Sequence, residues 1–140
     1  MERRFNIRVY GIWLHQGRVL VNEEIIRNKK IVKFPGGGLE FGEGIHDCLR
    51  REWLEELGLD VTILSHYYTT DFFQPSAYDD SQIISIYYLV SADPNIPIAN
   101  LNHNERTFWI ALNELTPETF TLPIDRVVGQ MLIENRGSAM

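Results

Sequence analysis

Residues 37–59 read GGLEFGEGIHDCLRREWLEELGL, and this stretch decides the fold of the chain. A glycine-rich loop leads into a helical pattern that runs from Gly44 to Leu57. Gly44 is an acceptable N-cap residue, and Gly58 stands at the C′ position, where a glycine commonly ends a helix. We therefore expect a loop followed by one helix in the middle of the chain.

The predicted helix does not have the pattern of an ordinary surface helix. Four apolar residues spaced four apart form the stripe that such a helix turns toward the core: Ile45, Leu49, Trp53 and Leu57. At about 100° per residue, three carboxylates fall beside this stripe instead of opposite it: Glu52, Glu55 and Glu56. Like charges at i,i+4, such as Glu52 and Glu56, destabilise a helix by roughly 0.2–0.5 kcal/mol. Burying a carboxylate without a partner costs several kcal/mol more.

A divalent cation is the compensation that we expect for these acids. Carboxylate and carbonyl oxygens suit a hard ion such as Mg²⁺ or Mn²⁺. Zinc is disfavoured because thiolate and imidazole ligands are scarce in the chain. The alternative is an acidic, solvated helix with a loose amphipathic pattern, which is the usual meaning of adjacent glutamates.

The remaining sequence predicts mostly strands and a second helix. Strands are expected over 5–14, 19–26, 30–34, 61–70, 82–90 and 107–111, long loops over 71–81 and 92–104, and a helix over 123–135. Strands interleaved with helices indicate an α/β (α+β) fold in which helices cover both faces of a mixed sheet. We interpret residues 1–140 as one domain, with residues 137–140 as a frayed tail.

The overall composition excludes several classes of protein. The 140 residues carry a formal net charge of −6, which argues against binding to a nucleic acid polymer. The single cysteine, Cys48, rules out an intramolecular disulfide framework and fits a reducing compartment. No apolar run has the length of a membrane span, and the first residues lack the pattern of a secretory signal. We therefore expect a cytoplasmic protein that does not bind membranes.

The spacing within residues 37–59 closely resembles the signature box of the Nudix hydrolases. Gly37 is followed by five residues and Glu43, and then by seven residues and the run REWLEELGL from Arg51 to Leu59. The one departure is Trp53, where the family usually has a smaller aliphatic residue. The resemblance implies a Nudix-like α/β/α sandwich with a central mixed β-sheet flanked by helices.

The resemblance also implies roles for the residues of the box. A main-chain carbonyl of Gly37 would be a metal ligand, beside the carboxylates of Glu52, Glu55 and Glu56. Arg51 would orient the neighbouring glutamates, and Glu43 would be either its partner or a base. The base varies in position within the family, and the candidates in this chain are a box glutamate such as Glu55 or Glu105 from a later loop. An exposed loop acid is an equal alternative for Glu105.

The implied reaction is Mg²⁺-dependent cleavage of a phosphoanhydride bond in a small nucleotide derivative, with Mn²⁺ as a substitute ion. Nucleoside diphosphate sugars, ADP-ribose and nucleoside triphosphates are the candidate substrates. The alternative is a Nudix fold that binds a nucleotide derivative as a sensor without cleaving it. Relatives often form dimers, so a homodimer remains open.

Four residues outside the box are candidates for contact with the substrate. Arg4 and Arg8, on the first predicted strand, would meet a phosphate or a ribose. Phe73 and Tyr78, in the loop over 71–81, would stack on a base. The alternatives are an exposed strand face for the two arginines and simple core packing for Phe73.

Overall fold

The computed structural model describes residues 3–101 and 103–136, and its elements follow the predicted order. The strands are β1 (Phe5–His15), β2 (Arg18–Ile26), β3 (Lys29–Lys33), β4 (Gly36–Gly38), β5 (Thr62–Thr69), β6 (Gln82–Ser91) and β7 (Glu105–Ala111). The helices are α1 (Ile45–Leu57), a short 3₁₀ turn η1 (Leu112–Glu114) and α2 (Pro123–Asn135). The tail predicted over 137–140 lies outside the described residues.

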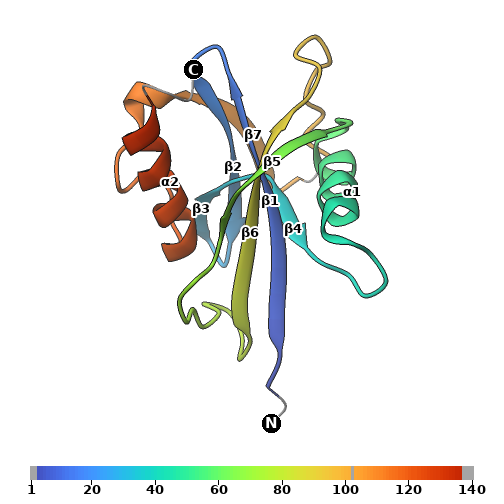
Figure 1. The fold of residues 1–140 in the computed structure, drawn as a ribbon, viewed down its shortest axis with the longest axis vertical. Helices are drawn as coiled ribbons and strands as arrows, with labels where there is room; N and C mark the ends of the chain where they lie inside the picture. Colours follow the sequence, from blue (N-terminus) through green and yellow to red (C-terminus); the bar gives the residue numbers. More distant parts are fainter. Residues whose placement is uncertain (1–2, 102, 137–140) are drawn as a thin grey trace.

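The strands form one mixed sheet with the order β3-β2-β1-β6-β5, while β4 pairs with β1 and β7 pairs with β2. The β1–β6 pair is parallel and the other pairs are antiparallel. Figure 1 shows α1 and α2 on opposite sides of this sheet, and the end of the sheet that carries β3 diverging from β1 and β6. The predicted fold class, a mixed sheet between two helices, is therefore confirmed.

Each face of the sheet has its own apolar core. On the α1 side, Leu49, Trp53 and Leu57 of the predicted stripe are fully buried, and Cys48 is buried beside them. On the α2 side, residues such as Phe34 and Tyr87 pack against the second helix. Because both faces are covered, the polar side chains that remain inside the molecule stand out as candidates for function.

The bulky Trp53 is accommodated by a glycine on the neighbouring strand. A Cβ at Gly11 of β1 would lie 2.8 Å from the Trp53 ring. The indole Nε1 donates a hydrogen bond to the main-chain oxygen of Pro35 at 3.1 Å. The hydrogen bond of the Trp53 ring therefore connects α1 to the residue that precedes β4, the strand of three glycines.

Two predicted boundaries differ from the structure. The glycines over 36–38, expected as a loop, form β4, in which Gly37 pairs with Val9 of β1. Glu105, expected in a loop, is the first residue of β7, since the antiparallel register with β2 continues to the pair Glu24–Glu105. No helix in the described residues is long and apolar enough to span a membrane.

Candidate active site

The glycine strand β4 brings the chain into close contact with the acids of α1. A side chain at Gly37 would overlap the Glu52 carboxylate, so only glycine allows this approach. Helix α1 begins after Gly44, where Asp47 accepts a hydrogen bond from the Gly44 nitrogen at 3.1 Å. It ends at Gly58, whose φ of 66° places it in the left-handed region that glycine favours. Both predicted helix ends are confirmed.

Arg51 is the centre of an ion-pair network that joins the loop to the helix. Its guanidinium donates two hydrogen bonds to Glu43, at 2.9 and 2.7 Å. The same group reaches Glu52 and Glu55, each at 3.2 Å, and the Gly38 oxygen at 3.0 Å. Because of the hydrogen bonds from Arg51, the pKa of Glu43 falls to about 2. Arg51 therefore fixes the relative positions of three glutamates, as only a planar, forked cation can.

The three predicted helix acids differ in their surroundings. Glu55 is 59% exposed, whereas the Glu52 side chain is almost buried and Glu56 is partly buried. Burial, together with the carboxylates of Glu105 and Glu52, raises the pKa of Glu56 well above its ordinary value. This is the behaviour of a carboxylate that is close to other carboxylates and short of positive charge.

Strand β7 brings Glu105, from a distant part of the sequence, close to Glu52 and Glu56 of α1; we call these three carboxylates the acidic group. The Glu105 side chain is only 5% exposed, and Lys33 Nζ lies 3.8 Å from its Oε1 atom. Lys33 Nζ is much closer to Glu24, at 2.5 Å. Burial raises the pKa of Glu105, and Lys33 opposes this effect. Burial would lower the pKa of Lys33, but Tyr10, Glu24 and Glu105 raise it above its ordinary value.

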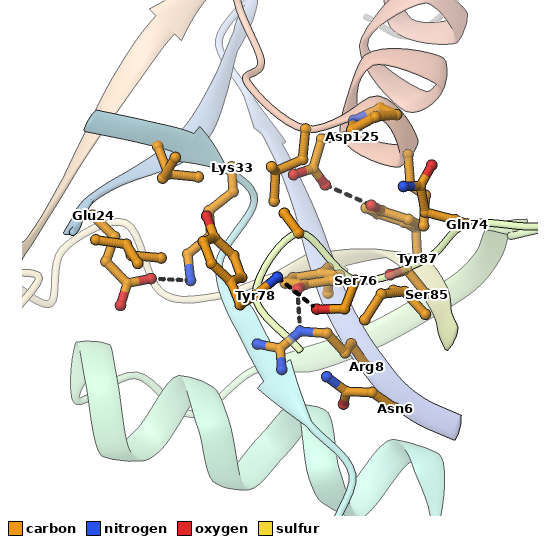
Figure 2. A pocket seen from close by; sticks show the side chains of 18 residues that line it. Asn6, Arg8, Glu24, Lys33, Gln74, Ser76, Tyr78, Ser85, Tyr87 and Asp125 are labelled. Atoms are coloured by element: carbon orange, nitrogen blue, oxygen red, sulfur yellow. Dashed lines mark hydrogen bonds and ion pairs between the residues drawn. The ribbon is translucent and has the colours of Figure 1, made fainter. Parts of the chain in front are cut away.

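A cleft of about 290 Å³ lies where the two parts of the sheet diverge. One wall comes from β1 and β6, the other from β2 and β3, and the loop around residue 76 and the start of α2 complete it. Figure 2 shows Lys33 and Glu24 on one wall and Arg8 on the other. Arg8 donates from Nε to the Tyr10 hydroxyl at 2.6 Å. Lys33 lines this cleft and pairs with Glu105 of the acidic group, and thereby connects them.

The cleft also has a buried carboxyl near the start of α2. The Tyr87 hydroxyl donates to Asp125 at 2.5 Å, as Figure 2 shows. Burial raises the pKa of Asp125 to about 6, an effect that the hydrogen bond from Tyr87 partly offsets. Tyr10 stacks on Tyr87 with ring centroids 5.3 Å apart. This part of the cleft is therefore aromatic, with a buried hydrogen-bond acceptor.

The predicted substrate residues fall into two groups. Arg8 and Tyr78 line the cleft. Arg4 pairs with Asp79 at 3.2 Å in an exposed position, and both Arg4 and Phe73 line a separate hollow. The structure therefore brings two of the four to the cleft and does not bring the other two.

The cleft residues Glu24, Lys33, Tyr87 and Asp125 were not among the predicted site residues, and neither was Asn22, which is buried on β2. Some carry a signal in the sequence. Asn22 directly follows three buried apolar residues of a strand, and the acid at 125 follows the proline that opens α2. The others became visible only through strand register.

The donors in this region are compatible with a hard divalent ion. Carboxylate oxygens of Glu52, Glu56 and Glu105 and the main-chain oxygen of Gly37 are the ligand types that Mg²⁺ prefers. Within 3–101 and 103–136, no three carboxylate, imidazole or thiol groups are already assembled as a metal site. Arg51 contacts Glu52 and Glu55 instead.

The NUDIX domain family model matches residues 2–130, which is most of the chain. The chain belongs to the Nudix family. The resemblance noted in the signature box is thus confirmed over almost the whole sequence. A search of curated proteins finds no significant match.

Solved structures of Nudix proteins share this fold. A NUDIX hydrolase from Nitrosomonas europaea is 21% identical, with 97% of this chain and 90% of that chain covered and a TM-score of 0.76. A MutT protein from Methanosarcina mazei Go1 is 19% identical, with coverages of 96% and 97% and a TM-score of 0.74. A MutT NUDIX hydrolase from Burkholderia pseudomallei is 17% identical, with coverages of 96% and 98% and a TM-score of 0.72. At these identities the likeness supports the fold.

Proposed function

We propose that this protein is a Mg²⁺-dependent pyrophosphohydrolase that cleaves a phosphoanhydride bond in a small nucleotide derivative. The observation that carries the proposal is the set of carboxylates on α1 that Arg51 contacts, together with the cleft beside them. Lys33, which also pairs with Glu105, lines that cleft. Membership of the Nudix family supports the hydrolase class. Nucleoside diphosphate sugars, ADP-ribose and nucleoside triphosphates remain the candidate substrates.

The charges in the cleft give the substrate a direction. The phosphates would lie toward α1, where Arg8 and Lys33 offer positive charge and where Glu52, Glu56 and the Gly37 oxygen would hold the cation. Arg8 suits this role because its guanidinium approaches Gly38, next to the glycine that packs against Glu52. The organic part of the substrate would lie against Tyr78 and the edge of Tyr10, since aromatic rings suit a flat base.

The chemistry requires a water oxygen to attack phosphorus while the bridging P–O bond breaks. A divalent cation held by Glu52, Glu56 and the Gly37 oxygen would neutralise phosphate oxygens and make the attacking water more acidic. Among the residues of this chain, Glu105 is our first candidate to take the water proton, because its carboxylate is buried and acts electrostatically on Glu56. Glu55 is the alternative base. Arg51 and Glu43 keep the acids in position and need not contact the substrate.

A product assay with and without Mg²⁺ tests the proposal. The panel contains nucleoside triphosphates, with added pyrophosphatase, and ADP-ribose and nucleoside diphosphate sugars, with added phosphatase that acts only on the cleavage products. We expect phosphate release that requires the cation and is abolished in Glu55→Gln or Glu56→Gln without loss of the fold. Full metal-dependent activity in both variants would refute the assignment. Tight nucleotide binding with no turnover across the panel would favour the sensor alternative.

A further inference from the structure

Asn22 is a buried polar residue without a hydrogen-bond partner. It is 1% exposed, and neither Nδ2 nor Oδ1 has a partner in the described parts of the chain. The three residues before it, Val19, Leu20 and Val21, are fully buried and apolar. Leaving a buried amide unpaired lowers stability, and asparagine is depleted in strands. A residue that lowers stability at such a position requires a reason other than packing.

The strand register places Asn22 next to the acidic group. Asn22 is the partner of Lys33 on β3 and of Thr107 on β7. Because side chains alternate along a strand, Glu24 and Glu105 lie on the same face as these residues. Asn22 therefore shares this face with the ammonium of Lys33 and with the carboxylates of Glu24 and Glu105, beside the proposed reaction site.

Glu105 is a buried carboxylate on the neighbouring strand. Its carboxylate is almost fully buried, yet Lys33 Nζ at 3.8 Å is beyond hydrogen-bond distance. Lys33 is held instead by Glu24 at 2.5 Å. An asparagine amide supplies two N–H donors, and rotation of its terminal group exchanges the nitrogen and oxygen positions. Asn22 can thus donate a hydrogen bond to the Glu105 carboxylate by rotation of its side chain alone.

We propose that Asn22 is a positioning residue, whose Nδ2 donates to the Glu105 carboxylate and holds it toward Glu56 of α1. The inference rests on the proposed function, in which Glu105 takes the water proton. A buried amide and a buried carboxylate, on neighbouring strands and on one face, carry it.

Thr107 provides a matched control on the opposite strand. Its Oγ1 is also buried and unpaired, and it is the direct cross-strand partner of Asn22. A threonine in a strand has a simple structural reason, since β-branched residues favour strands. Replacement of Thr107 by valine removes an unpaired polar atom at the same depth and leaves the proposed donor intact.

The test compares Asn22→Leu with Thr107→Val in the full chain, using thermal melting and steady-state kinetics on a substrate that the wild type hydrolyses. We expect Asn22→Leu to lower kcat about 10–100-fold, with KM within twofold of the wild type and a Tm close to that of the wild type, because a buried amide and its hydrogen bond to Glu105 are lost together. Thr107→Val is expected to raise the Tm and keep the wild-type kcat. Asn22→Ser, whose hydroxyl is too short to reach Glu105, is expected to lose kcat similarly and covers the case in which leucine does not fit.

The outcomes separate this inference from the proposed function. A wild-type protein with metal-dependent activity and an Asn22→Leu variant with unchanged kcat would overturn the role of Asn22 alone. Equal losses in Thr107→Val, or a loss of kcat accompanied by a lower Tm in both Asn22 variants, would also overturn it by showing general damage. A wild-type protein without hydrolase activity would refute the proposed function, and this inference with it.

Discussion

Replacement of Asp125 by asparagine should remove a specific pH dependence of stability. The Asp125 carboxyl is 4% exposed, and burial raises its pKa from 3.8 to about 6. A shift of about two units corresponds to about 3 kcal/mol. Because the folded protein binds this proton more tightly than the unfolded chain, the charged form costs stability above pH 6. This cost disappears as the pH falls from 6 toward 4.

Asparagine keeps an oxygen that accepts the hydrogen bond from Tyr87 and does not titrate. We therefore expect the free energy of unfolding of Asp125→Asn, relative to the wild type, to decrease by roughly 2.5 kcal/mol between pH 8 and pH 4. Acids with lowered pKa, such as Glu43, act in the opposite direction below about pH 4.5, but they do so equally in both proteins. Urea unfolding at several pH values measures the difference. A difference that is constant with pH would refute the burial of an ionisable Asp125.

Three further predictions concern the scaffold of the site. Arg51→Lys keeps the charge but loses the forked contact with Glu43, so kcat should fall at least tenfold while far-UV circular dichroism is unchanged; wild-type kcat would contradict this. Gly37→Ala should displace the Glu52 carboxylate. We therefore expect a large loss of kcat, and weaker Mn²⁺ binding in a metal titration. Gly11→Ala should force the Trp53 ring to move and lower the free energy of unfolding by roughly 1–3 kcal/mol, measured by urea unfolding, and an unchanged value would show that the ring has room.

Much of the fold could be predicted because it depends on local patterns. The helix from Gly44 to Leu57 has apolar residues at helical spacing and glycines at both ends, and the structure gives Ile45–Leu57. The strand predictions agree because Ile, Val and Tyr cluster in short runs between turns. The pairing of Arg51 with Glu43 also follows from the resemblance, since both positions belong to one short box.

The cleft could not be predicted because it arises from the divergence of distant strands. Nothing in the segment around Lys33 indicates that its ammonium lies between Glu24 and Glu105, which depends on the register of β2 with β3 and β7. The same register explains why Glu105 begins a strand instead of lying in a loop. The fit of Trp53 likewise depends on Gly11, which is 42 residues earlier in the sequence.

The central claim is that the acids of α1 gather around a divalent ion at the glycine strand. The most direct measurement is a crystal structure grown with Mn²⁺, in which anomalous scattering locates the metal. The account predicts an ion within about 2.0–2.3 Å of carboxylate oxygens from α1 and of the Gly37 oxygen. Glutamates 52, 55 and 56 turned into solvent, with no ion among them at saturating Mn²⁺, would contradict it.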